Sequence, residues 1–230
     1  MGAGKAFGET IKSFHFDYND LKKQVQDSGG IVTGSAVLSA KLKDDGLESF
    51  EPGDLDIFIK KDDPKISELE KYILSVGYMR MLSVKRKNYS ELVGKDLFSV
   101  YEYVKTEEQK KTDKSDGDKP LSKKTVQIII LNKDPLLYVD SFDLDCCKYY
   151  WDTVNDCIAF RGNVPPKNPK HTQLIPECSK MCTIERANKY IGRGFKIYHK
   201  DTDISELINY AATRPSNRYI DLINYLKTKK

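Results

Sequence analysis

The chain has 230 residues, of which 39% are hydrophobic and 31% charged, and its formal net charge is +4 at pH 7. This length is enough for one sizeable domain or two small ones, and no apolar run approaches the roughly 20 residues of a membrane-spanning helix. A charge of +4 permits an anionic substrate without establishing a nucleic-acid partner. We therefore expect an intracellular, cytoplasmic protein without a membrane partner.

The first ten residues, MGAGKAFGET, match none of the common N-terminal signals. They lack the apolar core of a signal peptide, and Ala6 stands where the myristoylation pattern requires Ser or Thr. A Walker A phosphate loop is excluded as well, because no Ser or Thr follows Lys5.

The first third of the chain predicts an alternation of helices and strands. Helical periodicity covers residues 16–29, 35–42 and 62–77, and strand-like runs cover residues 30–34 and 53–61. The last of these helices has Asp63 as its expected N-cap and Pro64 at its first helical position.

The remainder predicts two further strands followed by helices. Strands are expected over residues 97–104 and 125–131, and helical periodicity covers residues 183–195, 203–214 and 217–227. Residues 105–124 contain almost nothing apolar, so we expect a mobile loop there. A soft boundary near Pro165 and Pro166 separates an α/β portion, residues 1–164, from a mostly helical portion, residues 165–230.

The cysteines favour an intracellular setting. Their number is five, and Cys146 and Cys147 are adjacent, which suits reduced thiols better than a disulfide framework. The alternative is a zinc site that uses Cys178, Cys182 and His171, although this spacing matches no closed structural zinc site.

Two aspartates in the predicted strand at residues 53–61 point to a metal site. Asp54 and Asp56 are two residues apart, so their side chains project from the same face of the strand. Two adjacent carboxylates repel each other, and a divalent cation would remove that repulsion. Upstream, Gly34 permits a tight turn and Ser35 opens a helix whose free N–H groups can receive phosphate.

These residues resemble the signature of the polymerase-β-like nucleotidyltransferases. The match comprises VTGS at residues 32–35 and GDLDIF at residues 53–58, and the later segments are similar to small nucleotidyltransferase-like proteins of large DNA viruses and some fungi. The resemblance covers roughly residues 30–195 and implies an α+β fold, a small mixed sheet with helices packed on one side. For a viral protein, the location would be the host cytoplasm.

The resemblance also implies a reaction and its residues. Asp54, Asp56 and a third acid, Asp143, would hold two Mg²⁺ or Mn²⁺ ions, and Gly34 and Ser35 would receive the triphosphate. A nucleoside monophosphate would pass from an NTP such as ATP to an acceptor hydroxyl, with release of pyrophosphate.

A basic stripe and one ambiguity complete the expected site. Arg186, Lys189 and Arg193 follow each other at helical spacing and could clamp the nucleotide, although a solvated helix face would have the same pattern. Asp145 shares a predicted strand face with Asp143 and is the alternative third carboxylate.

Two other classes of function stay open: a catalytically silent protein that binds nucleotide or nucleic acid, and a structural protein that docks a partner. The sequence does not decide whether the acceptor is an RNA 3′ end, a protein hydroxyl or a small molecule, and it does not give the oligomeric state.

Overall fold

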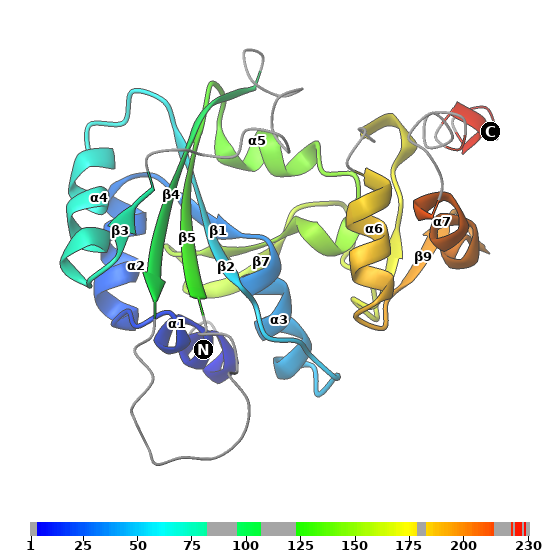
Figure 1. Cartoon of the computed structure of the whole chain (residues 1–230), viewed down its shortest axis with the longest axis horizontal. Coiled ribbons are helices and arrows are strands. Elements are labelled where there is room, and N and C mark those ends of the chain that lie inside the picture. Colours follow the sequence, from blue (N-terminus) through cyan, green and yellow to red (C-terminus); the bar gives the residue numbers. More distant parts are fainter. Residues whose placement is uncertain are drawn as a thin grey trace.

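The computed structural model describes residues 4–81, 96–106, 123–178 and 183–213, together with residues 222, 224–226 and 228. A mixed seven-stranded sheet forms its centre, in the order β3-β4-β5-β2-β1-β6-β7 (Figure 1). Its strands are β1 (Ile31–Thr33), β2 (Asp54–Lys60), β3 (Met79–Arg80), β4 (Leu97–Thr106), β5 (Lys123–Leu131), β6 (Tyr149–Asp152) and β7 (Cys157–Phe160). The central pair, β2 and β5, is parallel, and the other pairs are antiparallel. The predicted α+β class is confirmed.

Helices lie on both faces of this sheet. Those that cover it are α1 (Lys5–Ser13), α2 (Tyr18–Asp27), α3 (Ser35–Asp44), α4 (Ile66–Ser75) and α5 (Pro135–Asp140), whereas α6 (Thr183–Ile191) and α7 (Ser205–Ala212) lie beside a second sheet. Side chains of α1 to α4 share one buried cluster with Leu55 and Ile57 of β2. The opposite face carries a second cluster, in which Phe58 and Ile129 pack with residues of α5. The expectation of helices on one side is therefore incomplete, because β2 alternates apolar residues toward both faces.

Helix α3 is buried on all sides over its first six residues because these residues, SAVLSA, are apolar or small, whereas Lys43 and Asp44 at its end are exposed. It lies between the sheet and α1, which the sequence analysis did not predict as a helix. Its first residue, Ser35, directly follows the turn that ends β1. The strand, turn and helix predicted for residues 30–42 are thus present.

The C-terminal portion is less helical than expected. It contains a second sheet of three strands in the order β10-β9-β8, formed by β8 (His171–Gln173), β9 (Lys196–His199) and β10 (Thr202–Asp203). Helices α6 and α7 pack beside this sheet at one end of the molecule (Figure 1). Both helices contribute to the same buried cluster as the N-terminal helices, so one core spans the expected boundary at residue 165.

Four local predictions need correction or fall outside the described residues. Asp143 and Asp145 do not share a strand face as predicted, because a 3₁₀ turn, η2 (Asp145–Lys148), follows Asp143 and the strand β6 begins only at Tyr149. Helix α4 begins at Ile66 rather than at Pro64, and the Asp63 side chain caps the turn ahead of it by accepting from the Lys65 N–H. Most of the predicted loop 105–124, and most of the helix predicted over residues 217–227, lie outside the described residues.

A polar contact ties the β6–β7 turn to α2. Asp156 accepts hydrogen bonds from the Tyr18 hydroxyl (2.6 Å) and the Trp151 indole N–H (3.4 Å), and it pairs with Lys22 at 3.2 Å. Burial raises the pKa of Asp156, but the hydrogen bonds from Tyr18 and Lys22 outweigh it, so the pKa lies below its ordinary value. The charged form of Asp156 therefore stabilises this end of the sheet.

Among the helices that the structure describes, none has both the length and the apolar character to cross a bilayer.

Candidate functional site

The two aspartates of β2 lie on the same face of the sheet. Leu55 and Ile57, which alternate with them, are fully buried on the other face. Asp56 lies opposite Thr33 of β1 and beside Gln127 of β5 in the strand register. The predicted convergence of Asp54 and Asp56 is thus built into the centre of the sheet.

Gly34 brings the backbone against Asp56. Its dihedral angles, φ 80° and ψ −152°, belong to a region that is essentially restricted to glycine. A Cβ atom added at Gly34 would lie 2.5 Å from Oδ2 of Asp56. The Gly-Ser turn predicted from sequence therefore holds the chain at a distance from the carboxylate that no side chain would permit.

Ser35 connects this turn to the first aspartate. It is the first residue of α3, is only 6% exposed, and donates a hydrogen bond from its hydroxyl to Oδ1 of Asp54 (2.8 Å). No side chain caps the start of α3. Free N–H groups and the positive end of the helix dipole therefore lie next to the two carboxylates, an arrangement that suits an anion bound beside a cation.

The carboxyl group of Asp56 is electrostatically strained. Its Oδ1 atom is enclosed and has no hydrogen-bond partner among the described residues, although part of the residue remains exposed. Burial, and then the negative charge of Asp54, raise the pKa of Asp56 well above its ordinary value, while the positive charges of Lys189 and Arg186 oppose this shift. An enclosed carboxylate oxygen without a donor is the kind of ligand that a metal ion satisfies.

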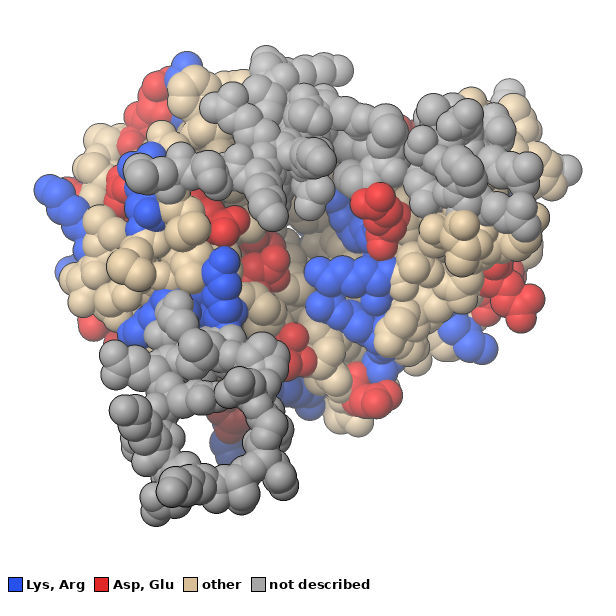
Figure 2. Space-filling view, viewed as in Figure 1, with Lys and Arg blue, Asp and Glu red and all other residues tan. Residues whose placement is uncertain are grey.

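The opposing cations come from α6. Arg186 and Lys189 are one helical turn apart, so they share one face of this helix. In the space-filling view, a patch of Lys and Arg borders a hollow near the centre of the molecule, and acidic side chains lie on its other side (Figure 2). The charges needed for a complex of cation and phosphate are therefore on opposite sides of one region.

Asp143 does not join the aspartate pair. It is 1% exposed and lies between α5 and η2, where Oδ2 accepts from the Thr183 hydroxyl and Oδ1 accepts from Nη1 of Arg186, both at 2.5 Å. Both of its oxygens are bonded to α6, and within the described residues it forms no three-ligand group with the aspartate pair, so the structure gives no support to its predicted role as a metal ligand. The alternative third acid, Asp145, pairs with Lys148 at 3.6 Å within η2.

Arg193 does not extend the basic face of α6. The helix ends at Ile191, and Gly194 then takes a left-handed φ of 80°. The guanidinium of Arg193 instead stacks on the ring of Phe50, 3.9 Å from its centroid, and lies 5.5 Å from that of Tyr190. The predicted stripe therefore comprises Arg186 and Lys189 only.

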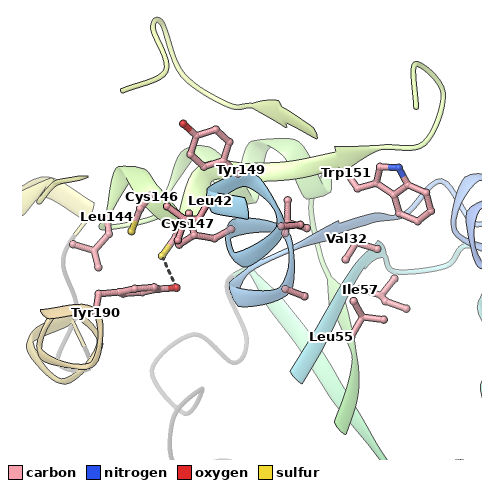
Figure 3. Close-up of a cluster of buried hydrophobic side chains, with 14 of the residues drawn as sticks. Val32, Leu42, Leu55, Ile57, Leu144, Cys146, Cys147, Tyr149, Trp151 and Tyr190 are labelled. Carbon is pink, nitrogen blue, oxygen red and sulfur yellow. Dashed lines mark hydrogen bonds between the residues drawn. The ribbon is translucent and has the colours of Figure 1, made fainter. Parts of the chain in front are cut away.

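The adjacent cysteines belong to the core that joins η2 to α6. Cys146 and Cys147 are buried, and the Cys147 thiol donates a hydrogen bond to the Tyr190 hydroxyl at 3.6 Å (Figure 3). Both are free thiols, as expected. The zinc alternative depends partly on Cys182, which lies outside the described residues.

Within the described ranges, no group of three or more His, Cys, Asp or Glu side chains could hold a metal ion. The fit of the site to a divalent cation rests instead on two acids, Asp54 and Asp56, with the enclosed Oδ1 of Asp56 as the strongest indication. Mg²⁺ commonly uses one or two carboxylates and completes its shell with water and phosphate oxygens, so two acids are sufficient for one ion.

Gln127 is the neighbour that sequence reasoning missed. It occupies the position on β5 directly beside Asp56, and Glu102 of β4 follows next to it. The row across the sheet thus places an amide directly beside Asp56 and an acid one strand further on. Only the pairing of β2 with β5 reveals this, because the two strands are about seventy residues apart in the chain.

The comparisons with known proteins give one match. No curated protein and no solved structure is similar to the chain. The resemblance to the polymerase-β-like nucleotidyltransferases is wrong as a family assignment, because a model of a different family matches residues 5–167. That stretch is more than two thirds of the chain and contains both aspartates, and the chain belongs to the Gabija anti-defense 2 (Gad2) family.

Proposed function

We propose that this Gad2 family protein is a phage-type protein that counters the Gabija defence through a metal-dependent reaction of a nucleoside triphosphate. Asp54 and Asp56 hold one Mg²⁺ or Mn²⁺ ion, and Arg186 and Lys189 receive the phosphates. The reaction is transfer of a nucleoside monophosphate to an acceptor hydroxyl.

The enclosed Oδ1 atom of Asp56 carries this proposal. A protein that used the pair only for stability would do better with a neutral residue at position 56, since the enclosed carboxyl group of Asp56, with its raised pKa, destabilises the fold when it ionises at neutral pH. The cations of α6 oppose that shift in the pKa of Asp56. The pair is therefore better explained by a bound cation and its phosphate ligand.

The residues of the chain have separate tasks in this reaction. The free N–H groups at the start of α3 bind phosphate oxygens, and Ser35 fixes the orientation of Asp54. When bound, the metal ion neutralises phosphate charge and favours ionisation of the acceptor hydroxyl. The acceptor oxygen then attacks the α-phosphorus, the bond to the β-phosphate breaks, pyrophosphate leaves with the bonding electrons, and the acceptor proton passes to water.

One observation favours a second function, in which the nucleotide is bound without turnover. Asp143 is engaged by Thr183 and Arg186, and the described residues place no third carboxylate beside the pair. A site for one ion binds a triphosphate with its metal but lacks the second ion that activates an acceptor. In this alternative the protein sequesters a nucleotide.

The first experiment measures binding of Mn²⁺ with each of the four NTPs by calorimetry, followed by pyrophosphate release with RNA, protein and no added acceptor. We expect binding that Asp56→Asn removes. The matched control is Asp62→Asn, an exposed aspartate with a φ of 69°, a conformation that asparagine tolerates. Equal NTP binding by wild type and Asp56→Asn would refute the metal site. NTP binding without release of pyrophosphate would favour the second function, in which the protein sequesters a nucleotide.

The second experiment tests the link to Gabija. Growth of a phage that encodes the chain is compared on cells with and without Gabija, for wild type, Asp56→Asn and Asp62→Asn. We expect Asp56→Asn alone to lose growth on the defended cells. Full growth with Asp56→Asn would separate the anti-defence effect from the aspartate site and leave partner docking as its explanation.

A further inference from the structure

Asp143 is held in place by contacts of both its side chain and its backbone. Asp143 is almost fully buried. It lies in the segment between α5 and η2, whereas its side chain contacts a different helix, α6. Its backbone is fixed too, since its carbonyl accepts from the Ile175 N–H at 2.9 Å. A buried acid that is paired with an arginine usually stabilises little compared with apolar residues of the same size.

The two bonds of Asp143 fix the rotation of α6. Thr183 is the first residue of this helix, and Arg186 follows three residues later on the same face. Because one carboxylate bonds both Thr183 and Arg186, it fixes the start of the helix and the rotation of the helix about its axis. Lys189, the next residue on that face, is directed by the same constraint.

A second tie restrains the same helix from the same segment. The Cys147 thiol, two residues into η2 from its start at Asp145, donates to the hydroxyl of Tyr190, which lies one turn beyond Arg186 (Figure 3). The segment from Asp143 to Cys147 therefore forms a fixed support, which sets the direction in which the basic face of α6 points.

Arg186 can bond Asp143 and still face an anion at the aspartate site. A guanidinium has five N–H donors in a planar fork, and the bond to Asp143 is made through Nη1. The side chain is 36% exposed, and its charge acts on Asp56. Arginine, unlike lysine, can bond a carboxylate with one edge and remain oriented toward a second anion.

We infer that Asp143 is a positioning residue, which orients Arg186 toward the β- and γ-phosphates of a triphosphate bound at Asp54 and Asp56. This inference rests on the proposed function and assigns the specificity for a triphosphate over a monophosphate to the contact between Asp143 and Arg186. Asp143 touches neither the metal nor the substrate.

The test compares the affinities of Mn²⁺ alone, Mn²⁺ with ATP and Mn²⁺ with AMP in the full chain. Asp143→Asn is expected to weaken ATP binding at least about tenfold, the scale of a weakened charge-assisted contact, with unchanged affinities for Mn²⁺ and AMP. The matched control is Asp145→Asn, the same change two residues away at a side chain that pairs within η2, and it is expected to bind like wild type.

A double-mutant cycle separates positioning from a merely structural role. Arg186→Gln alone should reproduce the loss of ATP affinity, and adding Asp143→Asn to it should cause no further loss. If the two losses add, Asp143 acts independently of Arg186 and the inference is overturned. If Asp143→Asn binds ATP like wild type, the inference is overturned while the proposed function stands.

Two further outcomes of these experiments also test the inference. If Asp143→Asn does not fold, Arg186→Lys takes its place, because lysine keeps the charge but loses the planar fork. A loss of ATP affinity in this variant supports the inference, and wild-type affinity overturns it. If the wild type itself binds no triphosphate, the proposed function fails, and the inference fails with it.

Discussion

Replacing Gly34 by alanine should destabilise the protein more than a glycine replacement elsewhere. The dihedral angles of Gly34 cost a residue with a side chain about 1–3 kcal/mol. The new Cβ would also lie 2.5 Å from Oδ2 of Asp56, and this carboxyl group cannot easily swing away because its other oxygen is enclosed. Overpacking of this kind costs a further amount of about 1–3 kcal/mol, so we expect a total of about 2–6 kcal/mol.

Equilibrium unfolding in urea measures this loss, and two comparisons isolate its cause. Gly46→Ala is the control, because Gly46 has a φ of 70° but nothing within 4 Å of its added Cβ, so it should cost only about 1 kcal/mol. In an Asp56→Ala background, Gly34→Ala should recover about 1–3 kcal/mol, the overpacking term. A loss that is the same with and without Asp56 would refute the close approach as its cause.

Three further predictions concern the framework of the site. Asp156→Asn should lower the free energy of unfolding by about 1–3 kcal/mol, because its charge-assisted hydrogen bonds are weakened. Since the pKa of Asp156 is lowered in the folded protein, this stabilisation is present above the unfolded pKa and is lost as the pH falls through the folded pKa. Urea titrations at neutral and acidic pH measure the loss, and a variant with the same acid dependence as wild type would contradict the prediction. Arg193→Ala should lower stability by about 0.5–2 kcal/mol, because its stack on Phe50 is lost, and leave triphosphate affinity unchanged; calorimetry that shows weaker ATP binding would return Arg193 to the site. Leu38→Ala should cost about 2–5 kcal/mol in a urea titration, because Leu38 is fully buried in α3, and a loss below about 1 kcal/mol would mean that this helix is loosely packed.

The local patterns predicted the elements that hold the aspartates, but they did not predict the arrangement around them. The strand of Asp54 and Asp56 and the helix that opens at Ser35 follow from periodicity over a few residues. The alternating neighbours of Asp143 suggest a strand, but the same pattern also suits the short segment between α5 and η2 where this residue lies. That Gln127 lies beside Asp56 on the neighbouring strand depends on strand pairing, which no local pattern specifies.

The sequence also contains local signals for the start of α5 and the end of α6. Asp134 followed by Pro135 is a typical helix start, and the Asp134 side chain does cap α5 by accepting from the N–H of Leu136 at 2.8 Å. Gly192 and Gly194 mark the end of α6, which should have removed Arg193 from a helical stripe. The core contact that joins α6 to the first half of the chain had no such signal, because it links residues far apart in sequence.

The shared core has a consequence for how the protein can be divided. Ile184, Ala187 and Tyr190 of α6 pack in the same buried cluster as Trp151 and the N-terminal helices. A fragment that ended at residue 164 would keep both aspartates but expose the apolar surface that α6 covers, and it would also lose Arg186 and Lys189. We therefore expect the two halves to unfold together, and a ligand that contacts the acids of one half and the cations of the other to stabilise the folded chain by mass action.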